Sequence, residues 1–143
     1  IRGSGPLAAA AVVEAAGGSA RQAADAASIS LQNTLGSPCD PVAGACEIPC
    51  HTRNAVAASS AFTCADLILG GYSNPIPLDE AIDASYEVGK ALPAELRCTA
   101  RGGCAVAPSA EPFPGDDKSP HSQYCRNRAV QTLVANQTVG SPS

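Results

Sequence analysis

Cysteines are the residues of this chain with the widest range of possible chemistry. The 143-residue sequence holds seven of them, more than a reducing compartment usually tolerates without a metal site. A structural zinc site would use C-x-x-C pairs, and the sequence contains none. We therefore expect disulfide bonds, with one cysteine free or bonded to another chain because seven is an odd number. The candidates are Cys39, Cys46, Cys50, Cys64, Cys98, Cys104 and Cys125.

The segment ACEIPCHTR, residues 45–53, offers a second chemistry. Cys46 and Cys50 are separated by three residues, and His51 directly follows Cys50. This resembles the haem attachment motif of c-type cytochromes, although that motif is C-x-x-C-H and the segment here holds one residue more. The resemblance implies bonds from both cysteines to haem, with His51 as the proximal iron ligand. His121, the second of two histidines, would supply the other axial ligand because the chain has no methionine.

Haem c is therefore the alternative cofactor. Copper or zinc, held by the two histidines and a cysteine, is a further alternative. Both need more supporting residues than the sequence offers, since few large apolar side chains are present to enclose a porphyrin. Our first expectation is that the chain binds no cofactor and no metal.

Two alanine-rich helices are predicted in the N-terminal part. The first covers Leu7–Ala16 and ends at a pair of glycines. Ser19 and Gln22 have the spacing of a capping box, so a second helix is expected to begin at Ser19. Its apolar face is narrow and built mainly from alanine, which suits close docking on another protein. We describe residues 1–36 as an alanine-rich N-terminal helical arm.

Two longer helices are predicted over about 52–69 and 78–92, where apolar residues recur at helical spacing. Glycines and prolines in the short connector between them favour an antiparallel αα-hairpin. With the cysteines that flank it, this region gives a disulfide-stapled αα-hairpin over residues 37–104. The fold class predicted is mainly α.

The hairpin suggests a pairing for some of the cysteines. Cys50 directly precedes the first of these helices and Cys98 follows the second, so antiparallel packing would bring the two together. A Cys46–Cys104 bond would then lie outside the first bond. Cys64 falls inside a helix and is expected to be a buried free thiol or to pair with Cys39 or Cys125.

Residues 105–143 are predicted to form an extended, proline-rich C-terminal tail. Residues 105–123 are rich in proline and poor in large apolar residues. Apolar residues between 129 and 134 suggest one short helix. The tripeptide beginning at Asn136 matches the N-glycosylation signal, so Asn136 is a glycosylation candidate if the chain passes through a secretory pathway.

Composition and charge exclude several classes of protein. The net charge of −4 and the 3% aromatic content argue against a nucleic-acid partner. The longest apolar run, Leu7–Val13, is too short for a transmembrane segment. The chain is thus expected to be soluble or peripheral to a membrane complex. Because it begins at Ile1 and lacks methionine, we interpret it as a processed product or a fragment of a longer precursor.

No catalytic constellation is evident from residue spacing. Ser59 and Ser60 lack the G-x-S-x-G elbow of serine hydrolases, and Cys64 lies too far along the predicted helix from His51 to form a dyad. The acidic residues of 79–87 fit a solvated helix face. We therefore predict that the chain is not an enzyme.

The function predicted is that of a non-catalytic structural or linker subunit. It would dock, as an accessory chain, on other protein subunits of a larger complex in an oxidising compartment, such as an organelle lumen (for example the thylakoid lumen) or the extracellular space. The alternative is a free-standing, secreted, cysteine-rich binding module that acts as an effector, inhibitor or ligand. A linker should be extended and covered by partners, whereas a module should be compact.

Overall fold

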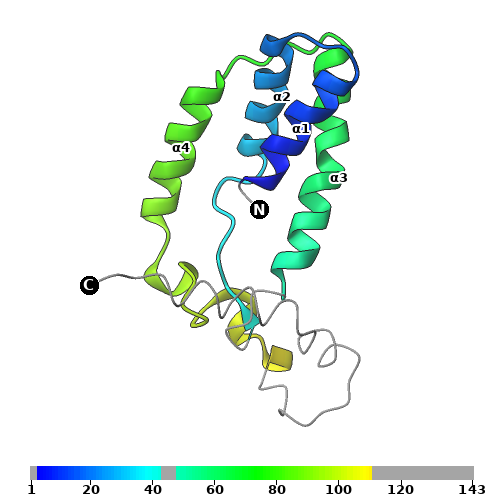
Figure 1. Ribbon diagram of the computed structural model, residues 1–143. Coiled ribbons are helices and arrows are strands. Elements are labelled where there is room, and N and C mark those ends of the chain that lie inside the picture. Colours follow the sequence, from blue (N-terminus) through cyan, green and yellow to red (C-terminus); the bar gives the residue numbers. More distant parts are fainter. Residues whose placement is uncertain (1–2, 43–47, 111–143) are drawn as a thin grey trace, which may run out of the picture.

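The computed structural model describes residues 3–42 and 48–110 (Figure 1). Within these ranges the chain is mainly helical, which confirms the predicted class. A single backbone bridge, between Cys39 and Arg97, is the nearest approach to sheet structure there. The elements are α1 (Ser4–Ala15), α2 (Ala20–Gln32), α3 (Cys50–Leu69) and α4 (Leu78–Ala91), followed by the short 3₁₀ turns η2 (Ala94–Leu96), η3 (Gly103–Val106) and η4 (Pro108–Ala110).

The boundary between α1 and α2 is set by local chemistry. Gly17 has φ +81°, a left-handed conformation that glycine adopts readily, and it turns the chain after α1. Ser19 then caps α2: its hydroxyl accepts from the Gln22 backbone N–H, and the Gln22 side chain accepts from the Ser19 N–H at 2.9 Å. The predicted capping box is confirmed.

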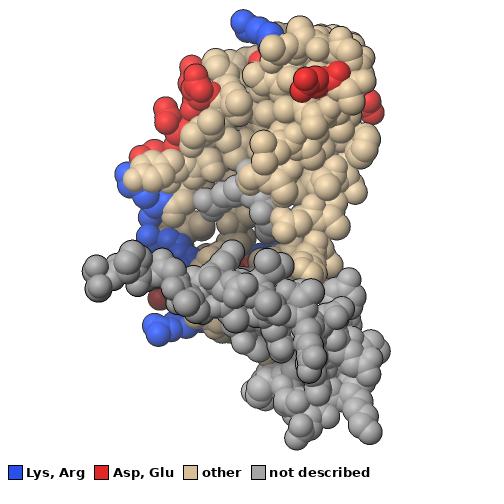
Figure 2. All heavy atoms as spheres, viewed as in Figure 1, with Lys and Arg blue, Asp and Glu red and all other residues tan. Residues whose placement is uncertain are grey.

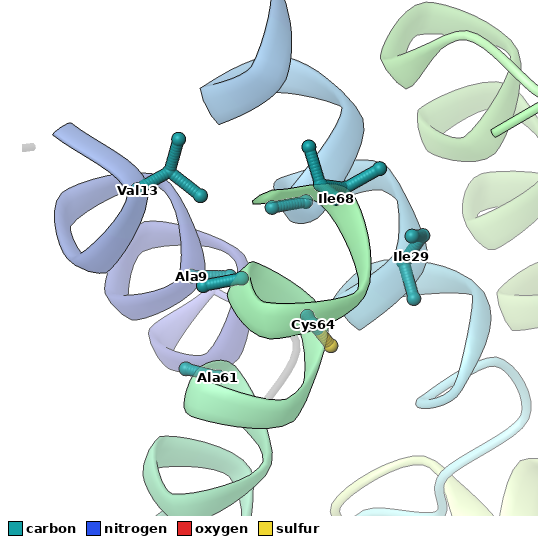
Figure 3. Packing of buried hydrophobic residues seen from close by; sticks show 8 residues of the cluster. Ala9, Val13, Ile29, Ala61, Cys64 and Ile68 are labelled. Atoms are coloured by element: carbon teal, nitrogen blue, oxygen red, sulfur yellow. The ribbon is translucent and has the colours of Figure 1, made fainter. Parts of the chain in front are cut away.

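The core lies where α1, α2 and α3 pack together. Most of its side chains are small and point toward one another between the three helices (Figure 3), so the backbones approach closely. A Cβ atom placed at Gly5 would lie 2.6 Å from the Ser30 hydroxyl, so α1 packs on α2 without room for a side chain there. The members of the core cluster are Ala9, Val13, Ala26, Ile29, Ala61, Cys64, Ala65 and Ile68.

Helix α2 is the central element. Its residues 26–31 are all buried, because α1 and α3 cover one side and α4 covers the other. The two helices of the predicted hairpin, α3 and α4, do run antiparallel, but α2 lies between them and α4 packs chiefly on α2 (Figure 1). The hairpin was expected to close on itself; the alanine-rich α2 fills that position because its small side chains allow contact on two faces.

The connector from α3 to α4 is fixed to α2 by hydrogen bonds. The Ser28 hydroxyl donates to the Ile76 carbonyl at 2.7 Å, and the Gln32 amide donates to Asn74 at 3.2 Å. None of the helices in the described ranges is long and apolar enough to cross a membrane. The proposed division into 1–36, 37–104 and 105–143 stays a prediction, and the short helix predicted near 129–134 lies outside the described residues.

Candidate functional site

Asp40 is a buried carboxylate next to the first turns of α3. It follows α2 in the loop toward α3, and its side chain is 1% exposed. The Arg53 guanidinium, on the first turns of α3, forms a two-armed ion pair with both carboxylate oxygens. The Cys104 backbone N–H, from η3, donates to the same carboxylate at 2.7 Å. One carboxylate therefore joins three segments of the chain, and the last of them, η3, lies 64 residues farther along the sequence.

The charges of this pair are strongly stabilised. The hydrogen bond from Arg53 lowers the pKa of Asp40 from its ordinary 3.8 to about 2, against the raising effect of burial, and the Cys104 N–H lowers it further. The hydrogen bond to Asp40 correspondingly raises the pKa of Arg53. Both groups are ionised over the whole physiological pH range.

Arg53 has two further partners. It donates to the Pro38 carbonyl at 3.2 Å and lies 3.7 Å from the Cys104 sulfur. Gly103 permits this close approach of η3: its φ is +63°, and a Cβ atom there would collide with the Asp40 carboxylate. The Asp40–Arg53 pair thus holds the α2–α3 loop, the start of α3 and η3 in a fixed arrangement.

A disulfide bond joins the same loop to the segment after α4. It links Cys39 with Cys98. Backbone hydrogen bonds flank it: the Cys39 N–H donates to the Leu96 carbonyl at 2.8 Å, and the Cys98 N–H donates to the Cys39 carbonyl at 2.7 Å. The helical pair α3 and α4 is therefore stapled near its ends, as predicted, but through Cys39.

An open pocket of about 760 Å³ lies between the α2–α3 loop, the start of α3 and the C-terminal end of α4. Both disulfide cysteines line it. Figure 2 shows acidic side chains along α4 and basic ones around its C-terminal end. Lys90 there is paired with Glu87 at 3.0 Å and lies 5.0 Å from the centre of the Tyr86 ring. Other lining residues are Cys50, Asn54, Leu92, Leu96 and Arg97. The pocket combines an apolar wall with cationic groups and thiol chemistry.

Four of the seven predicted cysteines meet at this junction: Cys39, Cys98, Cys50 and Cys104. The predicted Cys50–Cys98 bond is wrong, because Cys98 is bonded to Cys39 while Cys50 is a free thiol. The physical reason is that the α2–α3 loop passes alongside residues 96–98 and presents Cys39 to them. Cys104 is also free and exposed, and its suggested partner Cys46 lies outside the described residues.

The remaining predicted residues fall elsewhere. Cys64 is a buried free thiol in the core, as one alternative held, and burial raises its pKa. His51 is exposed on the first turn of α3. Cys125, His121 and Asn136 lie outside the described residues, so the haem, metal and glycosylation alternatives stay untested. No group of three metal-ligating side chains is found in residues 3–42 and 48–110.

Sequence reasoning missed Asp40, Arg53 and Gly103. Neither their spacing nor their types form a local pattern, because the pairing depends on how the loop and η3 fold back on α3. The sequence held one weak signal. Asp40 directly follows Cys39, in a region expected to be fixed by cross-links, where a side chain is more readily buried.

Comparison with known proteins decides the family. The family model described as "Serine dehydratase alpha chain" matches residues 2–105, which include every residue of the junction. The chain belongs to the serine dehydratase alpha chain family. No solved structure gives a significant match.

This serine dehydratase family member is similar to several bacterial proteins. It is 52% identical over 103 residues to the probable L-serine dehydratase alpha chain of Bacillus subtilis, covering 72% of this chain and 34% of that protein. It is 46% identical to the probable L-serine dehydratase alpha chain of Latilactobacillus sakei, and the match covers 72% of this chain and 49% of that protein. It is 44% identical over 101 residues to L-serine dehydratase 1 of Escherichia coli, and the match covers 70% of this chain and 22% of that protein. The chain thus spans half or less of the length of these relatives.

The family overturns the functional predictions. We predicted a non-catalytic linker or, alternatively, a secreted binding module, and we predicted that the chain is not an enzyme. These predictions are wrong, because the family is that of an enzyme subunit. The thylakoid, organelle-lumen and extracellular assignments are wrong for the same reason. They rested on counting cysteines as distributed cross-links, whereas four of them gather at one junction around a buried ion pair.

Proposed function

We propose that this chain is part of an L-serine dehydratase, an enzyme that removes water from L-serine. The observation that carries the proposal is the match of residues 2–105 to the alpha chain family, at 52% identity to the Bacillus subtilis protein. The matched region ends just after η3 begins and so contains the complete Asp40–Arg53 junction and its pocket. The chain would act together with other protein subunits or segments, since the relatives are longer and several are named as alpha chains.

We further propose that the junction pocket contributes to binding of the substrate carboxylate. At neutral pH, L-serine carries a carboxylate and an ammonium group. Arg97 lines the pocket, and a guanidinium matches a carboxylate in geometry and charge. Lys90 also lines it but is engaged by Glu87, which makes Arg97 the better candidate. The volume of about 760 Å³ leaves space for the remainder of an assembled active site.

A chimeric enzyme tests the activity. Residues 2–105 would replace the matching segment of the Bacillus subtilis alpha chain, which would then be produced with whatever subunits that enzyme requires. The unmodified Bacillus enzyme is the positive control. Consumption of L-serine by the chimera would support the proposed function. A chimera that folds and assembles like the control, but does not consume L-serine, would contradict it.

Substitution of Arg97 in the same chimera tests the pocket separately. Loss of one charge-assisted hydrogen bond should raise the KM for L-serine about tenfold in Arg97→Ala. Arg101→Ala is the matched control, because Arg101 is exposed on the same segment and does not line the pocket. An unchanged KM in an active Arg97→Ala chimera would reject the carboxylate assignment while leaving the dehydratase assignment intact.

The expectation that this chain binds no cofactor stays a prediction. Metal analysis and an absorption spectrum of the purified chimera would test it directly.

A further inference from the structure

The outer surfaces of α1 and α3 carry very little charge. Residues 4–13 of α1 and residues 54–65 of α3 contain no Asp, Glu, Lys or Arg. Helix α4 differs, because Asp79, Asp83 and Glu87 give it an exposed acidic side. A helix with one side in water normally has charged residues on that side, whereas a helix that is apolar all round is buried. The sequences of α1 and α3 are therefore typical of helices that are covered on a second side.

Large apolar side chains are exposed to water on these two helices. Leu7 of α1 is 74% exposed, and Phe62 and Leu69 of α3 are 61% and 39% exposed. Ala11 and Ala58, one helical turn from Leu7 and Phe62, are exposed as well. Figure 2 shows an uncharged surface over α1 and α3, with acidic side chains near its upper end. We call these five residues the α1–α3 face; an apolar surface of this kind marks a contact with another polypeptide.

The two helices contribute to one surface because α1 lies along α3. Near the start of α3, the Ser4 hydroxyl donates to the Asn54 side-chain oxygen at 3.1 Å. Near the end of α3, a Cβ atom placed at Gly18, just after α1, would lie 3.2 Å from a methyl group of Leu69. The exposed apolar residues of α3 follow Asn54 at helical spacing, so they lie on the side of α3 that borders α1.

The lengths of the relatives indicate what covers the face. The match covers 34% of the Bacillus subtilis alpha chain and 22% of the Escherichia coli enzyme, so most of each polypeptide lies outside it. A segment of the same polypeptide is present at a high effective concentration, which favours it over a second copy of this chain. Because the face is uncharged, the segment that fits it is an apolar one.

We propose that the α1–α3 face is the docking surface for the remaining part of a serine dehydratase alpha chain, which covers it with an apolar segment. Ala11 and Ala58 allow that segment to approach the two helix backbones closely, while Leu7 and Phe62 project between its side chains. The inference rests on the proposed function for the identity of the occupant. Its test does not use catalytic activity, so the two proposals can fail separately.

Hydroxyl-radical labelling with mass spectrometry measures the exposure of Phe62 in two settings. One is the full 143-residue chain alone, and the other is the chimera in which residues 2–105 replace the matching segment of the Bacillus alpha chain. We expect the labelling rate of Phe62 to be at least about fivefold lower in the chimera. Ile82, 50% exposed on the acidic α4, is the matched control and should be labelled equally in both. Equal rates for Phe62, with the core residue Val13 protected in both, would overturn the proposal.

Labelling of the full chain alone separates the other occupants. Labelling of Phe62 that falls as the chain is concentrated, together with a dimer in sedimentation, would identify a second copy as the occupant and overturn the proposal. Slow labelling at every concentration would show that the chain covers this face itself, with the same consequence.

A charged substitution should matter only where the face is covered. In the full chain, Phe62→Glu should leave the urea midpoint of unfolding nearly unchanged, since the side chain is exposed. In the chimera it should lower the midpoint by at least about 1 M urea, because it places an unpaired carboxylate in an apolar contact. Ile82→Glu is the control and should change neither midpoint. A Phe62→Glu chimera as stable as the unmodified chimera would contradict the proposal.

Discussion

A single buried ion pair organises the junction at the residue scale. Asp40 has almost no access to water, yet it is ionised, because Arg53 and the Cys104 N–H together replace the lost hydration. Removing one partner would leave a buried charge without compensation, so the pair behaves as a unit with the backbone that it touches.

Acid should weaken the fold through Asp40. Its pKa is lowered on folding, from 3.8 to about 2, so the folded state binds its proton less readily than the unfolded state. The stabilisation is complete above the unfolded pKa and is lost as pH falls toward the folded one; it amounts to about 2 kcal/mol. Urea unfolding at pH values between 7 and 2 measures this, and Asp40→Asn should abolish this part of the pH dependence. The same slope in both proteins would contradict the assignment.

Gly103 should be intolerant of any side chain. Gly103→Ala adds a Cβ at positive φ directly against the Asp40 carboxylate, so we expect a loss of about 1–3 kcal/mol in the free energy of unfolding. Gly3→Ala is the comparison, because a Cβ there meets no atom within 4 Å. Denaturant unfolding of both variants is the measurement, and equal stability would remove the argument for close packing of η3.

At the scale of elements, α1 and α2 are in contact through Gly5 and Ser30. Ser30 is 1% exposed, and its hydroxyl has no hydrogen-bond partner among the described residues. A buried hydroxyl without a partner costs free energy that an alanine would not. The interface therefore has one unfavourable group in an otherwise apolar contact.

A double-mutant cycle tests this contact. Ser30→Ala should stabilise the chain by about 1 kcal/mol, since it removes the unsatisfied hydroxyl and fills nearly the same space. Gly5→Ala should destabilise it, because its Cβ would lie 2.6 Å from that hydroxyl, and should cost less in the Ser30→Ala background. Strictly additive unfolding energies would show that the two positions do not interact.

On the scale of the whole molecule, the four helices differ in how firmly they are held. α3 buries five residues, whereas α4 buries only Ala81. Large apolar side chains on α4, Ile82 and Tyr86, are exposed. Since α4 packs mainly on α2 and buries one residue, it is the helix that loses the least buried surface when it opens.

We therefore expect α4 to open before the rest of the bundle. Native-state hydrogen exchange should show protection in α4 at least about tenfold lower than in α2 and α3, because local opening there exposes little apolar surface. The exchange of α1 serves as the internal reference, since its Ala9 and Val13 belong to the core. Equal protection in α3 and α4 would mean that the bundle opens as one unit.

The sequence by itself determined the helices and their ends. Helical periodicity, the Ser19–Gln22 capping box and the glycine pairs that follow α1 and α3 act over a few residues, so the four helices and the mainly α class could be predicted. A buried free thiol at Cys64 was one of the alternatives that the sequence left open, and it is the one found. Local interactions are fully encoded in neighbouring residues, which is why these predictions were correct.

Only the tertiary structure decided the partners. Placing α2 between α3 and α4 routes Cys39 to Cys98, and folding η3 back on α3 brings Asp40, Arg53 and Gly103 together. These contacts join residues far apart in the chain, and alanine-rich faces are too uniform to specify which helices will meet. A function that depends on such contacts leaves no local motif, because the packing of the elements creates the site.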